Sequence, residues 1–306
     1  MIKYIGIAAI LKMFSLTPQT KKIYRFLGNS VGARRRIKAG LTASYKDRAR
    51  LILSLFESYN IAQQNGRFLE LGTGWVHWES TVLRLFYNAK FILFDVWDNR
   101  QFQAFKSYFS EFRDAFNNEM KILPEKHEQA RGLLETILSA NSFDQVYNLL
   151  GFQYVLEPTG SLQDFKDEAF DACFSHGVFE HIDRAIVSEY IKNLYRLLKP
   201  GGYSFQLINT SDHLAEYDGS VCRKNYLKYS DVAWDLFFKN DVQYFNRIQR
   251  GEWLNLFSQA GFELLGEKST LYPVHTKINK KYENLDRKDI ECTTLEIVHR
   301  KPLKTV

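Results

Sequence analysis

The feature that most constrains the fold of this chain is a short apolar run that ends in two glycines. Residues 67–71 have the pattern of a buried strand, and Gly72, Thr73 and Gly74 follow at once. Glycines there let the backbone turn sharply and approach a ligand closely, while the next helix presents free N–H groups. The run therefore predicts a strand, a ligand-binding loop and a helix in succession.

An acidic residue strengthens this prediction. A second apolar run, residues 91–95, ends in Asp95, which lies 21 positions after Gly74. At that spacing a carboxylate can accept hydrogen bonds from both ribose hydroxyls of an adenosine. Two glycines alone are a weak indication, because many tight strand–helix turns use them. Together with Asp95 they predict a nucleoside site.

The residues after the loop narrow the choice of nucleoside. A dinucleotide fingerprint would place a third glycine at position 77, where this chain has His77, and a Gly-Lys-Ser/Thr run is absent from the sequence. The bulky residues 75–78 would also crowd a pyrophosphate at the helix N-terminus. A ligand without phosphate, such as S-adenosylmethionine (SAM), suits this loop better.

The rest of the hydrophobic pattern predicts an α/β fold with a doubly wound, mostly parallel seven-stranded sheet, because strands alternate with helices. Strands are expected over residues 67–71, 91–95, 152–157, 170–175, 203–208, 262–266 and 293–298, and helices over 45–59, 79–87, 184–198 and 252–260. We expect a basic helical extension over residues 1–45, broken at Gly28 and Gly32, and one domain over 46–306. Helical insertions at about 98–150 and 211–248 are expected to act as lids around the acceptor.

The distribution of charge and the cysteine content indicate the cellular compartment of the chain and its contact with membranes. The formal charge is +6, and much of the excess lies in the first 38 residues. The apolar run at residues 4–11 is too short to span a bilayer and is interrupted at Lys12. The preferred interpretation is an extension packed on the core; the alternative is weak contact of this basic segment with a membrane surface. Three scattered cysteines fit a reducing cytoplasm.

Four segments in order resemble the class I SAM-dependent methyltransferases, over roughly residues 65–300. They are residues 68–74, Asp95, residues 170–182 with their Glu-His pair, and residues 197–202. The resemblance implies SAM as methyl donor and S-adenosylhomocysteine as product. It departs from the family at Val76, where a third glycine is usual, and after the third strand, where the acid that reads the adenine amine is missing.

The resemblance also implies roles for individual residues. Glu70 would lie near the methionine amino group, Gly72, Thr73 and Gly74 would line the ligand, and Asp95 would hold the ribose. Val96 and Trp97 would flank the adenine, with Ser161, Leu162 and their backbone taking the place of the missing acid. Ser175 and His176 would lie at the end of the fourth strand, where SAM and acceptor meet; for His176 an ordinary structural hydrogen bond is an equal alternative.

Catalytic candidates follow the fourth and fifth strands. Asp212 and His213 are neighbours after the fifth strand, and such a pair could remove a hydroxyl proton during methyl transfer. His181 belongs to the Glu-His pair, which more often fixes the backbone than moves protons. Asp212, His213, Glu216 and Asp218 have no firm metal-ligand spacing, so no metal is expected.

The last third of the chain resembles bacterial methyltransferases associated with surface-polysaccharide biosynthesis. The segments concerned are residues 209–213, 226–230, 244–247 and 260–263. The sequence thus predicts a cytoplasmic SAM-dependent methyltransferase acting on a hydroxyl of a sugar or a related small metabolite. The alternatives are a non-catalytic SAM- or nucleoside-binding protein and a nucleotide-dependent oxidoreductase, which His77 disfavours. Arg34, Arg35 and Arg36 are interpreted as a solvated or phosphate-contacting face, and without a recognised motif no nucleic acid is expected as partner.

Overall fold

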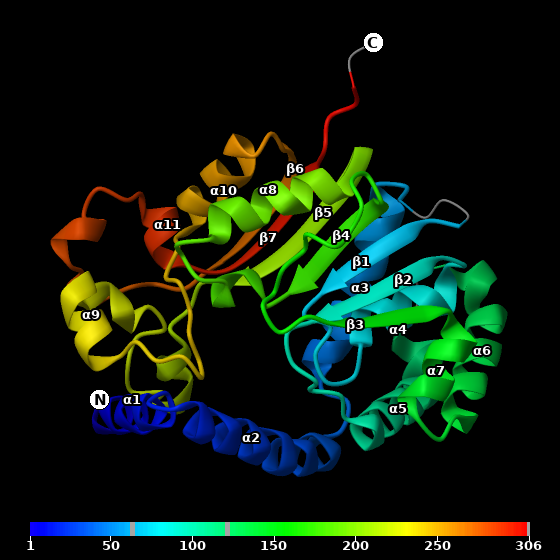
Figure 1. Ribbon diagram of the computed structural model, residues 1–306, viewed down its shortest axis with the longest axis horizontal. Helices are drawn as coiled ribbons and strands as arrows, with labels where there is room; N and C mark the ends of the chain where they lie inside the picture. The colour runs from blue at the N-terminus through cyan, green and yellow to red at the C-terminus, as the bar shows by residue number, and fades with distance from the viewer. Residues whose placement is uncertain (62–64, 120–122, 305–306) are drawn as a thin grey trace. The chain divides into compact units, whose positions relative to one another are not determined.

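The computed structural model describes residues 1–61, 65–119 and 123–304 of the chain (Figure 1). Its strands form a seven-stranded sheet in the order β3-β2-β1-β4-β5-β7-β6, with helices flanking it. Strand β1 pairs in parallel with β2, and β2 with β3, whereas β6 and β7 are antiparallel. The predicted α/β, doubly wound, mostly parallel seven-stranded sheet is therefore confirmed.

The first four strands agree with the predicted bounds to within one residue, whereas the last three are longer than predicted. They are β1 (Arg67–Leu71), β2 (Lys90–Asp95), β3 (Phe152–Leu156), β4 (Phe170–His176), β5 (Leu198–Asn209), β6 (Glu263–Leu271) and β7 (Cys292–Arg300). The chain divides into two compact units. We call residues 27–174 with 197–203 the loop unit, and residues 1–26, 175–196 and 204–306 the cavity unit.

The loop unit holds β1, β2 and β3 with a group of helices beside them (Figure 1). These helices are α3 (Ala43–Ser58), α4 (Trp78–Phe86), α5 (Phe102–Glu119), α6 (His127–Ser139) and α7 (Phe143–Leu150), with a 3-10 turn η1 (Pro124–Lys126) before α6. Phe109, Phe112 and Phe116 of α5 are buried. The ring centre of Phe109 lies 4.8 Å from that of Trp78 on α4, and the ring of Phe116 stacks on Phe86. The aromatic repeat of α5 is thus core packing.

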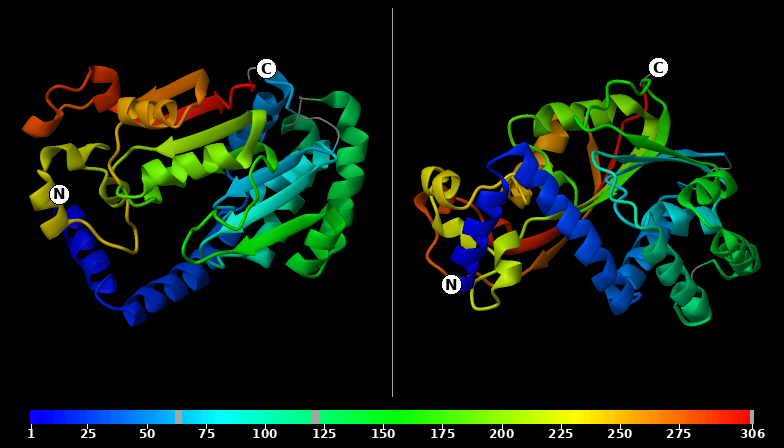
Figure 2. Two further views of the ribbon diagram at one scale, coloured as in Figure 1. Left: turned by 45° about the horizontal axis from the view of Figure 1, so that its top comes forward. Right: turned by 60° about the horizontal axis from the view of Figure 1, so that its bottom comes forward.

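The cavity unit holds β6, β7 and a second hydrophobic cluster. Its helices are α1 (Ile2–Phe14), α8 (Val187–Leu197), α9 (Asp231–Phe237), α10 (Arg250–Gln259) and α11 (Arg287–Glu291), with 3-10 turns η2 (Phe179–His181), η3 (His213–Tyr217), η4 (Asn225–Lys228) and η5 (Lys280–Tyr282). Tyr4, Ala8 and Leu11 of α1 pack with buried residues of the segment 214–245. Both views of Figure 2 show α1 beside this segment, so the early apolar run completes a core.

Two predictions of local structure were wrong. Helix α2 (Pro18–Ala39) runs through Gly28 and Gly32 without a break, because a helix tolerates glycine at a cost of only about 1 kcal/mol. The break instead precedes Pro18, whose fixed φ suits the first helical turn. Strand β5 begins at Leu198 rather than at 203, so residues 200–202 lie inside the strand.

Of the helices in the described residues, none is long and apolar enough to cross a membrane.

Candidate functional site

The glycine loop, residues 72–74, has the geometry that its sequence predicts. Gly72 and Gly74 have φ of 66° and 65°, in the left-handed region that glycine adopts without strain. The amide of Gly74 donates a hydrogen bond of 3.0 Å to Oδ2 of Asp95. The loop after β1 and the acid at the end of β2 therefore meet, as the spacing predicted.

The Asp95 carboxylate keeps room for a ligand. Its Oδ1 accepts from the amides of Val96 at 2.8 Å and Trp97 at 3.3 Å, while Oδ2 accepts, among the described residues, only from Gly74. A carboxylate has about four acceptor positions, so Oδ2 can accept another donor such as a ribose hydroxyl. Burial raises the pKa of Asp95 above its ordinary value, although the three amides act in the opposite direction.

Glu70 is buried at the end of β1 and shares its surroundings with a second acid. It accepts hydrogen bonds from the Ser80 hydroxyl and, at 3.4 Å, from the Thr73 hydroxyl. Burial, and then the nearby Glu79, raise the pKa of Glu70 to about 8. Glu70 thus favours its neutral form at pH 7, and a cation brought close to it would favour ionisation.

Arg48 of α3 balances the charge of Glu79 within the same buried region. Its Nε lies 2.5 Å from Oε1 of Glu79 and its Nη2 lies 2.7 Å from Oε2, which is a bidentate pair. Sequence reasoning missed this pair. The indication of it in the sequence was that Arg48 and Glu79 each occupy a position that helical periodicity places on an apolar face.

His77 takes the place of the third glycine of a dinucleotide loop, and it also takes a glycine-like conformation. Its φ is 46° and its ψ is 48°, and the buried ring lies between the Thr73 hydroxyl at 2.7 Å and the Tyr147 hydroxyl at 2.8 Å. Burial lowers the pKa of His77 to about 3, so the ring is neutral. His77 therefore links the loop to α7, a structural role that its sequence position alone did not reveal.

An arginine also contacts this loop. The Arg36 guanidinium carbon lies 3.2 Å from the ring centre of Trp75, and its Nη1 donates to Gln101 at 2.9 Å. The interpretation of residues 34–36 as a solvated face was therefore wrong for Arg36, because the side chain stacks on an aromatic ring. Arg34 and Arg35 are exposed, as expected.

The residues expected at the adenine lie next to the end of β2. The amide of Glu157 donates to the Asp95 carbonyl at 3.0 Å, and Gly160 lies beside Val96, since a Cβ there would be 3.5 Å from Cγ1 of Val96. Leu162 is buried, while Ser161 is exposed and accepts from the Gln163 amide at 3.2 Å. The structure thus groups residues 157–162 with Val96 and Asp95.

Ser175 and His176, the last residues of β4, belong to the cavity unit. The Ser175 hydroxyl is buried and donates to Oε1 of Gln206 on β5. His176 is half-buried. Ser175 therefore has a structural partner within the sheet.

Asp212 and His213 are neighbours in sequence, but they do not form a hydrogen-bonded pair. Oδ2 of Asp212 accepts from the Tyr4 hydroxyl at 2.7 Å, and Oδ1 accepts from the Leu214 amide at 2.9 Å. The ring of His213 instead lies 5.0 Å from that of His181 and 4.7 Å from that of Phe245. Burial, and then His181, lower the pKa of His213 to about 3, which makes it a poor proton acceptor at neutral pH.

Glu180 completes a compact group with these two histidines. One potential ligand atom from each of Glu180, His181 and His213 lies within 4.8 Å of the others. Nδ1 of His181 donates to the Tyr244 carbonyl at 2.6 Å, which leaves its Nε2 outside that bond. We call these three residues the Glu180 group. It differs from the set of Asp212, His213, Glu216 and Asp218 considered from the sequence.

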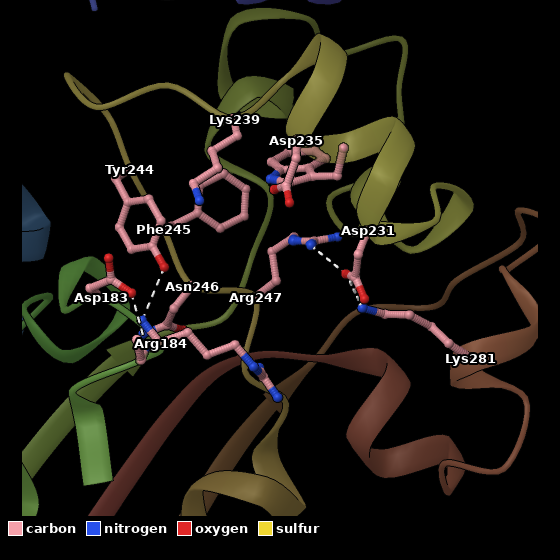
Figure 3. Close-up of a pocket in the computed structure, with 12 residues that line it drawn as sticks. Asp183, Arg184, Asp231, Asp235, Lys239, Tyr244, Phe245, Asn246, Arg247 and Lys281 are labelled. Carbon is pink, nitrogen blue, oxygen red and sulfur yellow. Dashed lines mark hydrogen bonds and ion pairs between the residues drawn. The ribbon is translucent and has the colours of Figure 1, made fainter. Parts of the chain in front are cut away.

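A cavity of about 420 Å³ lies in the cavity unit (Figure 3). Its lining combines aromatic rings with charges of both signs: Asp183, Arg184, Ala185, Asp231, Trp234, Asp235, Lys239, Tyr244, Phe245, Asn246, Arg247 and Lys281. Arg247 pairs with Asp231 at 2.7 Å and lies over the Trp234 ring at 4.9 Å. Because Tyr244 also holds His181, and Phe245 contacts His213, the cavity wall and the Glu180 group are built on the same segment.

Comparisons with known proteins find one match to a family model and several similar solved structures. Residues 126–205 match the family model of a methyltransferase domain. A search of curated proteins finds no match. Among solved structures, a SAM-dependent methyltransferase from Methanosarcina mazei is 15% identical, with 81% of this chain and 98% of that chain covered and a TM-score of 0.43.

Two further structures give similar values. Burkholderia thailandensis 1,6-didemethyltoxoflavin-N1-methyltransferase, solved with bound 1,6-didemethyltoxoflavin and S-adenosylhomocysteine, is 13% identical over 83% of this chain and 78% of that chain, with a TM-score of 0.44. Haemonchus contortus phosphoethanolamine N-methyltransferase 2, solved with SAM, is 13% identical over 83% of this chain and 52% of that chain, with a TM-score of 0.46.

Proposed function

We propose that this chain is a SAM-dependent methyltransferase that methylates a hydroxyl oxygen of a sugar or a related small polar metabolite. The observation that carries the donor assignment is the hydrogen bond between Gly74 and Asp95, because it sets a carboxylate with spare acceptor capacity beside a loop without phosphate-binding features. Glu70 and residues 157–162 extend this site to the methionine and adenine parts of SAM. The methyltransferase-domain match supports the same donor.

The lining of the cavity supports a polar, ring-shaped acceptor. The half-buried ring of Tyr244 offers an apolar face, while Arg184, Asp183 and Lys239 offer donors and acceptors of both signs. Small-molecule sites combine such apolar walls with a few polar groups that fix orientation. A saccharide has both an apolar ring face and many hydroxyls, so it matches this lining better than a purely apolar acceptor.

Methyl transfer to a hydroxyl asks little covalent chemistry of the protein. The bound donor supplies an activated sulfonium methyl group. The acceptor oxygen forms a bond to the methyl carbon as the sulfur–carbon bond breaks, which leaves S-adenosylhomocysteine, and the hydroxyl proton must leave. Positioning supplies much of the rate. Within the Glu180 group, Glu180 and His181 are the side chains that would accept the departing proton.

The proposal is tested by incubating the purified chain with SAM labelled in its methyl group and a panel of free sugars, sugar phosphates and nucleotide sugars. We expect labelled product with at least one of them, and its loss in Tyr244→Ala, because the half-buried Tyr244 ring lines the cavity. SAM binding without turnover on any acceptor would favour the non-catalytic alternative. Thermal stabilisation by NAD but not by SAM would favour the oxidoreductase.

The cellular location and the membrane contact of the chain are also part of the proposal. We propose a cytoplasmic enzyme of polysaccharide biosynthesis, with residues 1–45 as a basic extension of a domain over 46–306. Exposed apolar residues of α1, such as Ile2 and Ile5, together with nearby lysines, support weak contact with anionic membrane surfaces. Sedimentation with phosphatidylserine vesicles, compared with neutral vesicles, tests that contact.

A further inference from the structure

We infer that Glu180, His181 and His213 form a binding site for one divalent transition-metal ion. One carboxylate and two imidazoles are the protein ligands of several catalytic zinc sites and of non-haem iron sites. Their ligand atoms already lie within 4.8 Å of one another, and ligands at about 2.0–2.2 Å from a shared ion require only a further small approach. The proposal departs from the expectation, drawn from the sequence, that the chain holds no metal. That expectation weighed Asp212, His213, Glu216 and Asp218, and the two sets share only His213.

Glu180 gives the first independent reason for a cation. Its side chain is buried, with 3% exposed, and its Oε1 accepts from the Asn209 amide at 3.2 Å. Its Oε2 has no hydrogen-bond partner within the described parts of the chain. A buried carboxylate oxygen without a partner is unfavourable, so a bound cation would satisfy a group that the fold leaves unsatisfied.

His181 gives the second reason, through the orientation of its ring. A carbonyl oxygen can only accept, so the 2.6 Å contact with Tyr244 fixes the proton of His181 on Nδ1. Its Nε2 then carries the lone pair that a metal needs. Metal-binding histidines characteristically donate their other ring nitrogen to a backbone carbonyl or a carboxylate, which is the arrangement found here.

His213 completes the group from the start of η3. Its buried ring packs against Phe245 and lies 5.0 Å from the ring of His181, which is exposed. Two of the three side chains are therefore buried, and the third is exposed to solvent. Three protein ligands with an accessible side leave a position for water or an acceptor oxygen, as in catalytic rather than structural zinc sites.

A role for such an ion in methyl transfer rests on the proposed function. An ion held by the Glu180 group would bind the acceptor hydroxyl and lower the pKa of that hydroxyl, so that the proton leaves more readily. Metal binding itself is independent of that role. We therefore choose an experiment that measures binding and involves no methyl transfer.

The test is titration of the chelator-treated, full-length chain with Zn²⁺ by calorimetry, and with Co²⁺ by visible absorption. We expect one ion per chain, with d–d bands that report nitrogen and oxygen ligands, and no comparable binding of Mg²⁺, which prefers oxygen ligands. His213→Ala and Glu180→Gln should each weaken Zn²⁺ binding by more than the ~10–100-fold that loss of an outer-shell partner costs.

His275→Ala is the matched control, because His275 is exposed and lies outside the Glu180 group. It should leave the affinity unchanged. Circular dichroism and SAM binding show whether each variant is folded. Absence of saturable Zn²⁺ binding, or equal affinity in the folded His213→Ala variant and the parent chain, would overturn the inference while leaving the methyl-transfer assay as a separate question.

Discussion

The amide of Gly74 lies 3.0 Å from Oδ2 of Asp95 and donates a hydrogen bond to it. The contact follows from strand pairing, because β1 and β2 are parallel neighbours with Leu71 opposite Phe94, so their carboxyl ends meet. The positive φ of Gly74 then directs its amide toward the acid. One hydrogen bond thus joins the loop that would line the donor to the carboxylate that would hold its ribose.

Replacement of Asp95 by Asn should weaken SAM binding by roughly 10- to 100-fold, as expected when a charged acceptor of one or two hydrogen bonds is lost. Isothermal titration calorimetry measures the change. Asp98→Asn is the control, because Asp98 is 44% exposed and pairs with Arg100. If the two variants bind SAM equally well, the ribose assignment is wrong.

Replacement of His77 by Ala should lower the free energy of unfolding by about 3 kcal/mol, because the buried hydroxyls of Thr73 and Tyr147 each lose a partner. His77→Gly removes the same ring but relieves the left-handed backbone conformation. We therefore expect the Gly variant to be more stable than the Ala variant by about 1 kcal/mol. Urea unfolding compares the two, and the opposite order would refute a strained backbone at this position.

The extent to which the sequence predicted the site depended on how local each interaction is. Asp95 and residues 72–74 could be predicted, because parallel pairing places both strand ends at one sheet edge. The pairing of His213 with His181 could not, since it depends on the path of residues 213–245. For the same reason Asp212 was assigned to its neighbour, although its Oδ2 bonds to Tyr4, 208 residues away.

Helix boundaries show the same limit. Gly28 and Gly32 were expected to break the N-terminal helix, yet helix propensity is a weak preference and α2 continues through both. The apolar run at residues 4–11 was correctly expected to pack rather than span a membrane. Which residues it packs against could not be predicted, because its cluster is formed by side chains more than 200 positions later.

His299 should make the stability of the chain depend on pH. Its ring is buried, stacks on Phe257 at 4.5 Å, and has an Nδ1 without a partner among the described residues. Burial lowers its pKa to about 4, whereas an unfolded histidine titrates near 6.5. Below pH 6.5 the unfolded state binds more protons, so stability falls as the pH decreases toward 4.

His299→Phe should remove this contribution, which is up to about 1.4 kcal/mol per pH unit, while keeping the stacked ring. We expect the variant to gain stability relative to the parent chain as the pH falls from 6.5 to 4. Urea unfolding at a series of pH values measures this gain. A constant difference between the two proteins across the series would contradict a buried, neutral His299.

Glu70 and Glu79 should respond in opposite ways to the same substitution. Burial raises the pKa of Glu70 to about 8, so between about pH 4.5 and 8 the folded state holds a proton that the unfolded state has lost, and stability falls as the pH rises. Glu70→Gln removes this loss of stability and should stabilise the chain at pH 8. It should also weaken SAM binding, since the methionine ammonium loses its acid.

Glu79→Gln instead leaves Arg48 without its bidentate partner and should destabilise the chain by about 3–5 kcal/mol. Urea unfolding at pH 8 together with calorimetry of SAM binding separates the two residues, and a destabilised Glu70→Gln with unchanged SAM affinity would show that Glu70 is a structural rather than a ligand-binding acid.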